Sequence, residues 1–395
     1  MIKRRFLPSG QISKIGFILF FSGLGLAAVR TVWSVYLKSF LGNDSYVGFL
    51  ITAFTIIGII SYIVLIPLVE KKNNAGLFVL STFLFFLSYL LFTIFTTLYA
   101  VIILGVLTSI LASLRVTTIG IIISDKSKNS ELSKNEGFVY TFFNLAWLVG
   151  PLFAGFISEK YGFSFVFLIS SILMFLSLIL FKFFKISDTK KPKRLDKNLY
   201  KLTKDFFNNK DRVFSYIISG GINFWWGLIY VFMPLYIIEM GFSTFIVGLF
   251  LFAIVAPLIF FSYYFGNLAG KKGFKKISFL GYLILSILAI FSFIFSFNPI
   301  IVMILLVLAS VGGAMIESTS EAYFFDIIKK KQREKYYGVY NTAIDLNHLA
   351  TSFIGAIILL FLPFKFLFLF FGVFMLFFSI VSLKLKNIVE SRRKN

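Results

Sequence analysis

The sequence predicts an all-α integral membrane protein whose twelve transmembrane helices form two pseudo-symmetric six-helix bundles. Its 395 residues are 58% hydrophobic and only 14% charged, with a mean hydropathy of +0.91. A soluble domain is closer to half apolar and about a quarter charged. The apolar residues gather in long runs, and features of the first half recur in the second. This composition excludes a soluble enzyme, a disordered chain and, because Cys is absent, a disulfide scaffold.

Twelve apolar runs are long enough to be spans, since a helix needs roughly 20 apolar residues to cross a bilayer core of ~30 Å. The first run is too long for a signal peptide and no small-residue cleavage site follows it, so we expect a retained helix. We place the spans at 15–37, 46–69, 75–96, 98–124, 137–158, 163–184, 213–238, 244–268, 277–297, 299–325, 337–362 and 364–384.

The basic residues separate by side of the membrane. Of the 39 Lys and Arg, 34 fall on the side of the N-terminus, while Lys38, Lys160 and Lys365 fall on the other and Arg30 and Arg115 lie within spans. The positive-inside bias therefore predicts a multi-pass plasma-membrane protein with both termini in the cytoplasm. The net charge of +22 then reflects topology and contacts with membrane lipids, not nucleic-acid binding.

A hydrophilic stretch divides the spans into two sets of six. We predict an N-terminal bundle over 1–184, a cytoplasmic linker over 185–212 with one amphipathic turn around 199–207, and a C-terminal bundle over 213–395. The halves match at an offset of about 200 residues, as a parallel repeat of six-span units would. Asp125 at the end of span 4 matches Asp326 at the end of span 10, and Gly137 matches Gly338.

The loop between spans 8 and 9 carries a specific motif. Its sequence, GNLAGKKGFKK at 266–276, resembles the G-x-L-x-D-R-x-G-R-K loop of the major facilitator superfamily, with Gly270 in place of the acidic residue. The resemblance covers essentially the whole chain and implies the twelve-helix fold of that family. The matching positions are Gly266, Leu268, Lys271, Gly273 and Lys275.

The first-half counterpart of this loop is IPLVEKKNNAG at 66–76, which keeps Leu68, Glu70 and Lys71 but loses the glycines. The resemblance implies that both loops take part in gating. It also implies that Glu70 docks at the cytoplasmic start of span 11, where a helix N-terminus favours negative charge. That contact would stabilise the state closed to the cytoplasm.

Span 5 contains AWLVGPLFAG at 146–155, in which Gly150, Pro151 and Gly155 resemble the G-P-x-x-G-G signature of the family's drug:proton antiporters. Small residues at these positions also suit close helix packing, which is the simpler interpretation. Arg115, in LASLRVTTIG, resembles the family's span-4 arginine.

Charges within the spans are the strongest functional signal, because a charge inside a membrane is costly. Arg115 and Glu317 each lie roughly 15 Å from the cytoplasmic edge at ~1.5 Å per residue. Glu321 lies one helical turn from Glu317, and Asp345 is in span 11. Spans 1, 4, 7 and 10 line the cavity in the resembled fold. The resulting candidates for the substrate cavity are Arg30, Arg115, Asn223, Trp226, Tyr230 and Glu317.

Three interpretations of these charges stay open. They can form static ion pairs, such as Arg115 with Glu317. A carboxylate can instead carry a coupling proton, since desolvation raises a carboxyl pKa and a nearby Arg lowers it; the candidates are Glu317, Glu321 and Asp345. Finally, Arg30 or Arg115 can bind an anionic substrate.

Together these features predict a secondary active transporter, not an enzyme, that moves a small organic solute by alternating access. We expect proton-coupled efflux; the alternative is proton-linked or facilitated uptake of an organic anion or a sugar. No cofactor or metal is expected, since the chain has one His and no Cys, and no Walker A sequence indicates ATP. The expected partners are the substrate, protons and lipids, with the protein a monomer.

Overall fold

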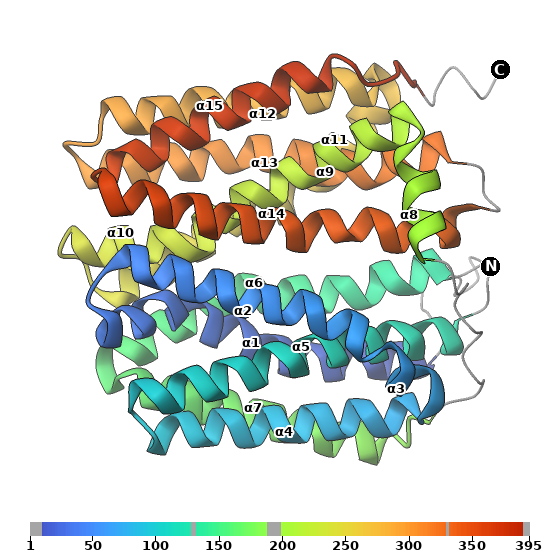
Figure 1. Ribbon diagram of the computed structural model, residues 1–395, viewed down its shortest axis with the longest axis vertical. Helices are drawn as coiled ribbons and strands as arrows, with labels where there is room; N and C mark the ends of the chain where they lie inside the picture. The colour runs from blue at the N-terminus through green and yellow to red at the C-terminus, as the bar shows by residue number, and fades with distance from the viewer. Residues whose placement is uncertain (1–9, 128–131, 188–198, 329–331, 390–395) are drawn as a thin grey trace, which may run out of the picture. The chain divides into compact units, whose positions relative to one another are not determined.

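The computed structural model describes residues 10–127, 132–187, 199–328 and 332–389 (Figure 1). The described residues are helical, without a strand, and twelve of their helices are long and apolar enough to cross a membrane. The predicted fold class is therefore confirmed. The spans are α1 (Gly10–Leu41), α2 (Asp44–Val64), α4 (Asn74–Ile94), α5 (Leu98–Lys126), α6 (Leu132–Tyr161), α7 (Phe163–Phe183), α9 with η1 and α10 (Lys210–Glu239), α11 (Thr244–Lys272), α12 (Phe274–Ile294), α13 (Pro299–Ile327), α14 (Arg333–Phe361) and α15 (Lys365–Ser382).

Prolines interrupt two of the predicted spans. The run 46–69 ends as α2 at Val64, and a short helix α3 (Ile66–Lys71) follows with Pro67 in its first turn. The run 213–238 divides into α9 (Lys210–Gly227), a π-helical turn η1 (Leu228–Phe232) and α10 (Met233–Glu239), in which Pro234 lies in the first turn. A proline has no N–H for the preceding turn, which favours a break or a change of hydrogen-bond register at these two places.

The chain divides into two compact units. Unit 1 comprises Met1–Phe40, Ala53–Leu195 and Ser243–Leu249, and unit 2 comprises Leu41–Thr52, Asp196–Phe242 and Phe250–Asn395. The first residues of α2 group with unit 2, where the Ser45 hydroxyl donates to the Ala356 carbonyl at 2.7 Å. The first residues of α11 group with unit 1, where the Ser243 hydroxyl donates to the Glu159 carboxylate at 2.6 Å. The boundary between the two units therefore does not fall only at the predicted linker, because these two short segments group with the opposite half of the chain.

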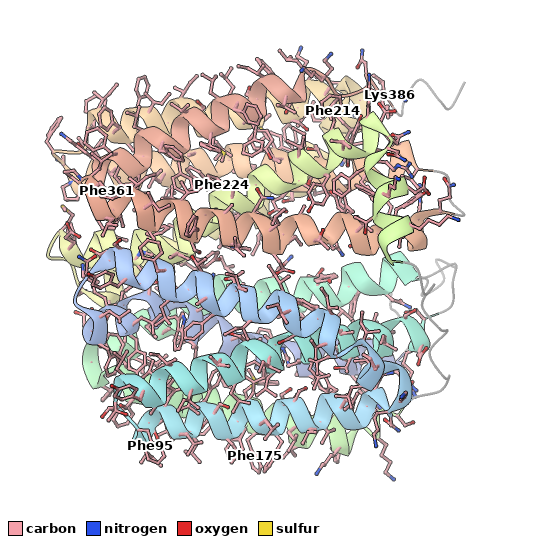
Figure 2. The ribbon with its side chains drawn as sticks, in the orientation of Figure 1. Phe95, Phe175, Phe214, Phe224, Phe361 and Lys386 are labelled. Atoms are coloured by element: carbon pink, nitrogen blue, oxygen red, sulfur yellow. The ribbon has the colours of Figure 1, made fainter. Side chains whose placement is uncertain are left out.

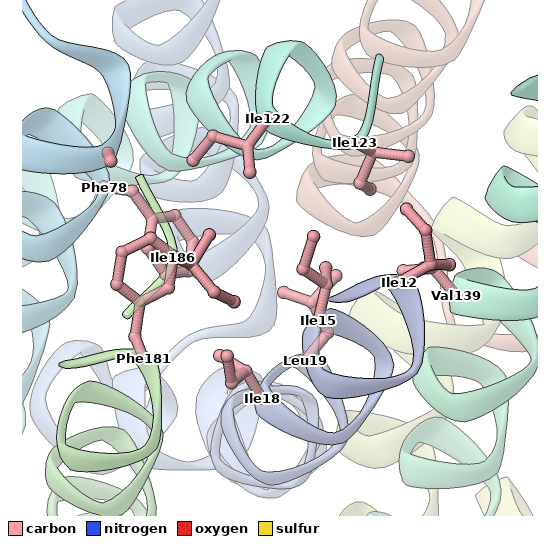
Figure 3. Packing of buried hydrophobic residues seen from close by; sticks show 11 residues of the cluster. Ile12, Ile15, Ile18, Leu19, Phe78, Ile122, Ile123, Val139, Phe181 and Ile186 are labelled. Atoms are coloured by element: carbon pink, nitrogen blue, oxygen red, sulfur yellow. The ribbon is translucent and has the colours of Figure 1, made fainter. Parts of the chain in front are cut away.

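Unit 1 is held by aliphatic and aromatic packing between its helices. Ile12, Ile15 and Ile18 follow one face of α1 and meet Phe78 of α4 and Phe181 of α7 in a cluster of buried side chains (Figure 3). The rings of Phe78 and Phe181 lie 4.8 Å apart. Because these residues come from three helices far apart in sequence, the cluster fixes how α1, α4 and α7 are placed within the unit.

In unit 2, α12 packs against α13 and α15, while α9 packs against α13 and α14. The amphipathic turn predicted at 199–207 is confirmed as α8 (Leu199–Phe207), which packs against α9 and α14 (Figure 1). Phe206 of α8 is fully buried beside Phe324 and Tyr336. This part of the linker is therefore an integral element of unit 2.

Large apolar side chains cover the outside of both units. Phe95 and Phe175 lie at the surface of unit 1 and Phe361 at that of unit 2, whereas Phe224 is enclosed by unit 2 (Figure 2). Phe361 is 76% exposed, a degree of apolar exposure that suits contact with lipid chains.

Candidate functional site

In unit 2, the carboxylates of α13 lie among aromatic side chains. Glu317 is half-buried and accepts a hydrogen bond from the Trp226 indole at 2.7 Å. Glu321, four residues later on the same face, accepts one from the Tyr337 hydroxyl at 2.5 Å. Within the described part of the chain, no cationic side chain lies within 4.0 Å of either carboxylate. Among the described residues, this pair of carboxyl groups therefore has no basic partner.

The aromatic wall beside Glu317 comes from α9 and η1. Trp226 is 8% exposed, and its ring centroid lies 5.8 Å from that of Tyr230. Tyr230 belongs to the π-helical turn, where the altered register places it differently from a regular helix position. A carboxylate that contacts one ring of an aromatic pair is an environment suited to an organic cation.

Two other candidates of unit 2 are placed less directly. The Asn223 amide donates to the Ser219 carbonyl of its own helix at 2.9 Å, so this donor is already used. Asp345 is half-buried in α14, one helix away from the carboxylates of α13. Neither shares a hydrogen bond with Glu317.

In unit 1, Arg115 of α5 is only 4% exposed. Its guanidinium donates to the Ser22 hydroxyl of α1 and lies 5.5 Å from the centre of the Phe78 ring. Its Nε has no hydrogen-bond partner, and no carboxylate of the described residues lies within 4.0 Å. A buried cation with an unused donor is expected to attract an anionic group.

Arg30, the second cation expected in the cavity, lies in α1 eight residues after Ser22 and is half-buried. It makes interactions of its own and is not a bare charge. The helix that supplies the hydroxyl partner of Arg115 thus also carries this second arginine.

The loop of the family motif has one position that requires glycine. Gly273 precedes α12 with φ of +96°, a conformation that other residues rarely adopt. A Cβ added there would also lie 3.0 Å from the Asn387 side-chain oxygen. Gly266 and Lys271 belong to α11 and Lys275 to the first turn of α12, so the glycine turns the chain between two basic helix ends.

The counterpart loop in unit 1 forms the short helix α3. Lys71 ends this helix and is exposed. The side chain of Glu70 lies outside the described part of the structure, so its expected contact with span 11 stays a prediction.

The glycines of the span-5 motif lie at close helix contacts. A Cβ on Gly150 would approach that of Ala27 in α1 to 2.7 Å, and one on Gly155 would lie 2.7 Å from the Thr244 carbonyl oxygen. Pro151 lies between them inside α6. This geometry accounts for the small residues by packing alone.

Sequence reasoning did not identify the immediate partners of these charges. Ser22 and Tyr337 hydrogen-bond Arg115 and Glu321, but a hydroxyl is common in membrane helices and its facing depends on the rotation of each helix. Spacing along one helix does not reveal that rotation.

The family model of the Major Facilitator Superfamily matches residues 15–297 and 251–395, which is most of the chain. The chain belongs to the major facilitator superfamily. It is therefore a membrane transporter of that fold. No curated protein matches the sequence.

Solved structures show the same fold at low identity. A POT family transporter in complex with a thioalcohol-conjugated peptide matches with a TM-score of 0.78 at 13% identity, covering 95% of each chain. A D-xylose–proton symporter matches with a TM-score of 0.74 at 16% identity, covering 96% of this chain and 98% of that one. A bacterial homologue of the human lysosomal transporter Spinster matches with a TM-score of 0.72 at 12% identity, covering 97% of each chain.

Proposed function

We propose that this transporter is a proton-coupled exporter of a small organic solute, with Glu317 as the residue at which proton and substrate compete. The observation that carries the proposal is the Glu317–Trp226 hydrogen bond of 2.7 Å, in an acidic and aromatic environment where no described basic side chain lies within 4.0 Å of the carboxylate. Glu321 and Asp345 are the secondary candidates for proton coupling.

The proposed competition between proton and substrate follows from the surroundings of Glu317. A carboxylate in a membrane interior is stabilised only when its charge is compensated. With no cationic partner among the described side chains near Glu317, compensation comes from a proton or from a cationic ligand. Because one site cannot hold both charges, entry of a proton from one side displaces a cation bound from the other. This competition couples proton influx to substrate efflux.

The remaining cavity candidates supply recognition. Trp226 and Tyr230 offer ring faces to the apolar part of the solute, and Asn223 lies one turn before Trp226 in the same helix. In unit 1, we assign Arg30 and Arg115 to the substrate path. The loops with Gly266, Gly273 and Lys271 remain proposed gating elements.

A second function is favoured by Arg115. Its buried guanidinium and unpartnered Nε suit a carboxylate or phosphate of the substrate. This observation supports proton-linked or facilitated uptake of an organic anion. Sugar uptake is the other form of this alternative; a D-xylose–proton symporter shares the fold, and at 16% identity this likeness concerns the fold alone.

We further propose that the protein works as a monomer in the plasma membrane, with both termini in the cytoplasm. The bias of Lys and Arg toward one side of the spans supports this orientation.

A ligand screen tests these proposals. The melting temperature of the purified protein would be measured with tetraphenylphosphonium, benzoate and glucose at pH 6 and pH 8, because a ligand that binds only the folded state raises stability. Export predicts stabilisation by tetraphenylphosphonium that is stronger at pH 8 and absent in Glu317→Gln. Stabilisation by benzoate that is lost in Arg115→Gln would instead establish the anion alternative and overturn the export proposal.

A further inference from the structure

A cavity of about 340 Å³ lies between the linker helix α8 and the ends of α13 and α14 in unit 2. Arg212, Asn209 and Gln332 supply polar side chains to its wall, and Ile327 supplies an apolar one. The site is separate from Glu317, which lies ten residues before Ile327 on α13.

The cavity is built by specific contacts of α8. Phe206 is fully buried, with its ring centroid 5.9 Å from that of Tyr336. The Tyr336 hydroxyl donates to the Asp205 carboxylate at 2.5 Å. These contacts attach α8 to the first turns of α14 and give the cavity fixed walls.

Arg212 is the principal cation of this cavity. Its guanidinium lies 4.3 Å from the centre of the Tyr336 ring and donates through Nη2 to the Asp205 carbonyl at 2.6 Å. The same group lies 3.6 Å from the Asp205 carboxylate. The Arg212 Nε is buried but has no hydrogen-bond partner. Nη2 is therefore occupied by Asp205 and Nε beside it is shielded, whereas Nη1 makes no hydrogen bond with the described residues.

Asp205 is the acidic residue of the cavity wall. Its carboxylate already accepts a hydrogen bond from Tyr336 and pairs with Arg212. Nearby, Lys201, Lys204 and Lys210 are exposed. Asp211, the other acid of this segment, pairs with Lys386 at 2.5 Å. Asp205 and Arg212, the charged residues that line the cavity, therefore balance each other, and the lysines add positive charge only on the surface outside it.

The cavity adjoins the ends of three candidate spans. The span that includes α9 begins at Lys210, the α13 span ends at Ile327, and the next span begins at Tyr336. These ends mark the membrane boundary on the side that the basic residues predict to be cytoplasmic. Anionic headgroups and soluble phosphate esters are both present there.

We propose that this cavity binds a phosphate group, which Arg212 holds through its Nη1 group, and that the bound phosphate fastens α8 to unit 2. The isoleucine wall suits the glycerol part of a phospholipid headgroup, and a soluble phosphate ester has the same recognition chemistry.

Retention of lipid by the full-length protein in detergent tests the proposal. Native mass spectrometry would compare phosphatidylglycerol with phosphatidylcholine, and glycerol 3-phosphate would be tested by melting temperature. Arg212→Gln removes the donor. Gln332→Glu adds a negative charge at an exposed residue that makes no helix-capping hydrogen bond, so it leaves the Arg212 contacts intact. Lys204→Gln removes an equal positive charge from an exposed position outside the cavity.

We expect Arg212→Gln and Gln332→Glu to weaken phosphate binding by about tenfold, the effect of losing one charge-assisted hydrogen bond, and Lys204→Gln to leave it unchanged. Preference for phosphatidylglycerol identifies a lipid, whereas stabilisation by glycerol 3-phosphate identifies a soluble ester. Equal losses in Lys204→Gln and Arg212→Gln, or no loss in Gln332→Glu, would overturn the proposal. If Arg212→Gln does not fold, Gln332→Glu decides the question.

Discussion

Two adjacent tryptophans of α9 provide a matched test of the role of Glu317. Trp226 donates its indole N–H to Glu317 at 2.7 Å, whereas the Nε1 of the fully buried Trp225 has no hydrogen-bond partner. Replacement by Phe makes the same chemical change at both positions. Only Trp226→Phe removes a hydrogen bond to the proposed binding carboxylate.

The expected magnitude follows from that bond. A hydrogen bond to a charged group contributes about 1.5–3 kcal/mol, and about 1.4 kcal/mol corresponds to a factor of ten. Because Glu317 is half-buried and can recruit water, we expect the lower end of this range. Trp226→Phe should therefore weaken binding of an organic cation about tenfold. Trp225→Phe leaves a void in a packed interior, so it should lower the melting temperature and leave the affinity unchanged.

The assay is isothermal titration of tetraphenylphosphonium at pH 8, with the melting temperature of each variant measured in parallel. Equal affinities of the two variants, or a larger loss in Trp225→Phe, would show that Glu317 does not bind through its bond to Trp226.

Three further predictions concern other parts of the structure. Glu317→Gln should remove the difference in cation binding between pH 6 and pH 8, because a proton and the cation then no longer share a carboxylate at this position. Glu321→Gln should keep the difference. The reverse result would assign the coupling proton to Glu321. Arg115→Gln should not lower the melting temperature, since it removes a buried charge without a carboxylate partner among the described residues, and a fall of more than about 5 °C would contradict this. Gly273→Ala should destabilise the protein by about 1 kcal/mol because alanine is strained at this positive φ, whereas Gly120→Ala, on an open helix face, should not. Equal melting temperatures of the two variants would refute the claim that position 273 requires glycine.

The fold was predictable because a membrane span is specified by length and hydropathy, which one sequence displays directly. Hydropathy does not report hydrogen-bond register. The π-helical turn at Leu228–Phe232 and the break after Val64 were therefore missed, although Pro234 and Pro67 were visible in the sequence. The grouping of the first residues of α2 and α11 depends on tertiary contacts such as Ser45 with Ala356. No periodicity records such a contact.

The candidate site was predictable in its charges and not in its partners. Glu317 and Arg115 stand out because a charge in an apolar run has few alternative explanations. Their partners Trp226 and Ser22 belong to other helices, and the rotation of one helix against another follows from packing across the whole unit. Arg212 was assigned to the linker because it precedes the apolar run. The structure places its side chain in a cavity instead.

The most direct test of the central claim is proton movement coupled to substrate movement. Purified protein in liposomes with an entrapped pH-sensitive dye would receive a gradient of tetraphenylphosphonium, and the internal pH would be recorded for the wild type and Glu317→Gln. The proposal predicts that protons move opposite to the cation in the wild type and that this flux disappears in the variant. Cation movement without a pH change, or equal proton flux in the two proteins, would contradict proton-coupled export through Glu317.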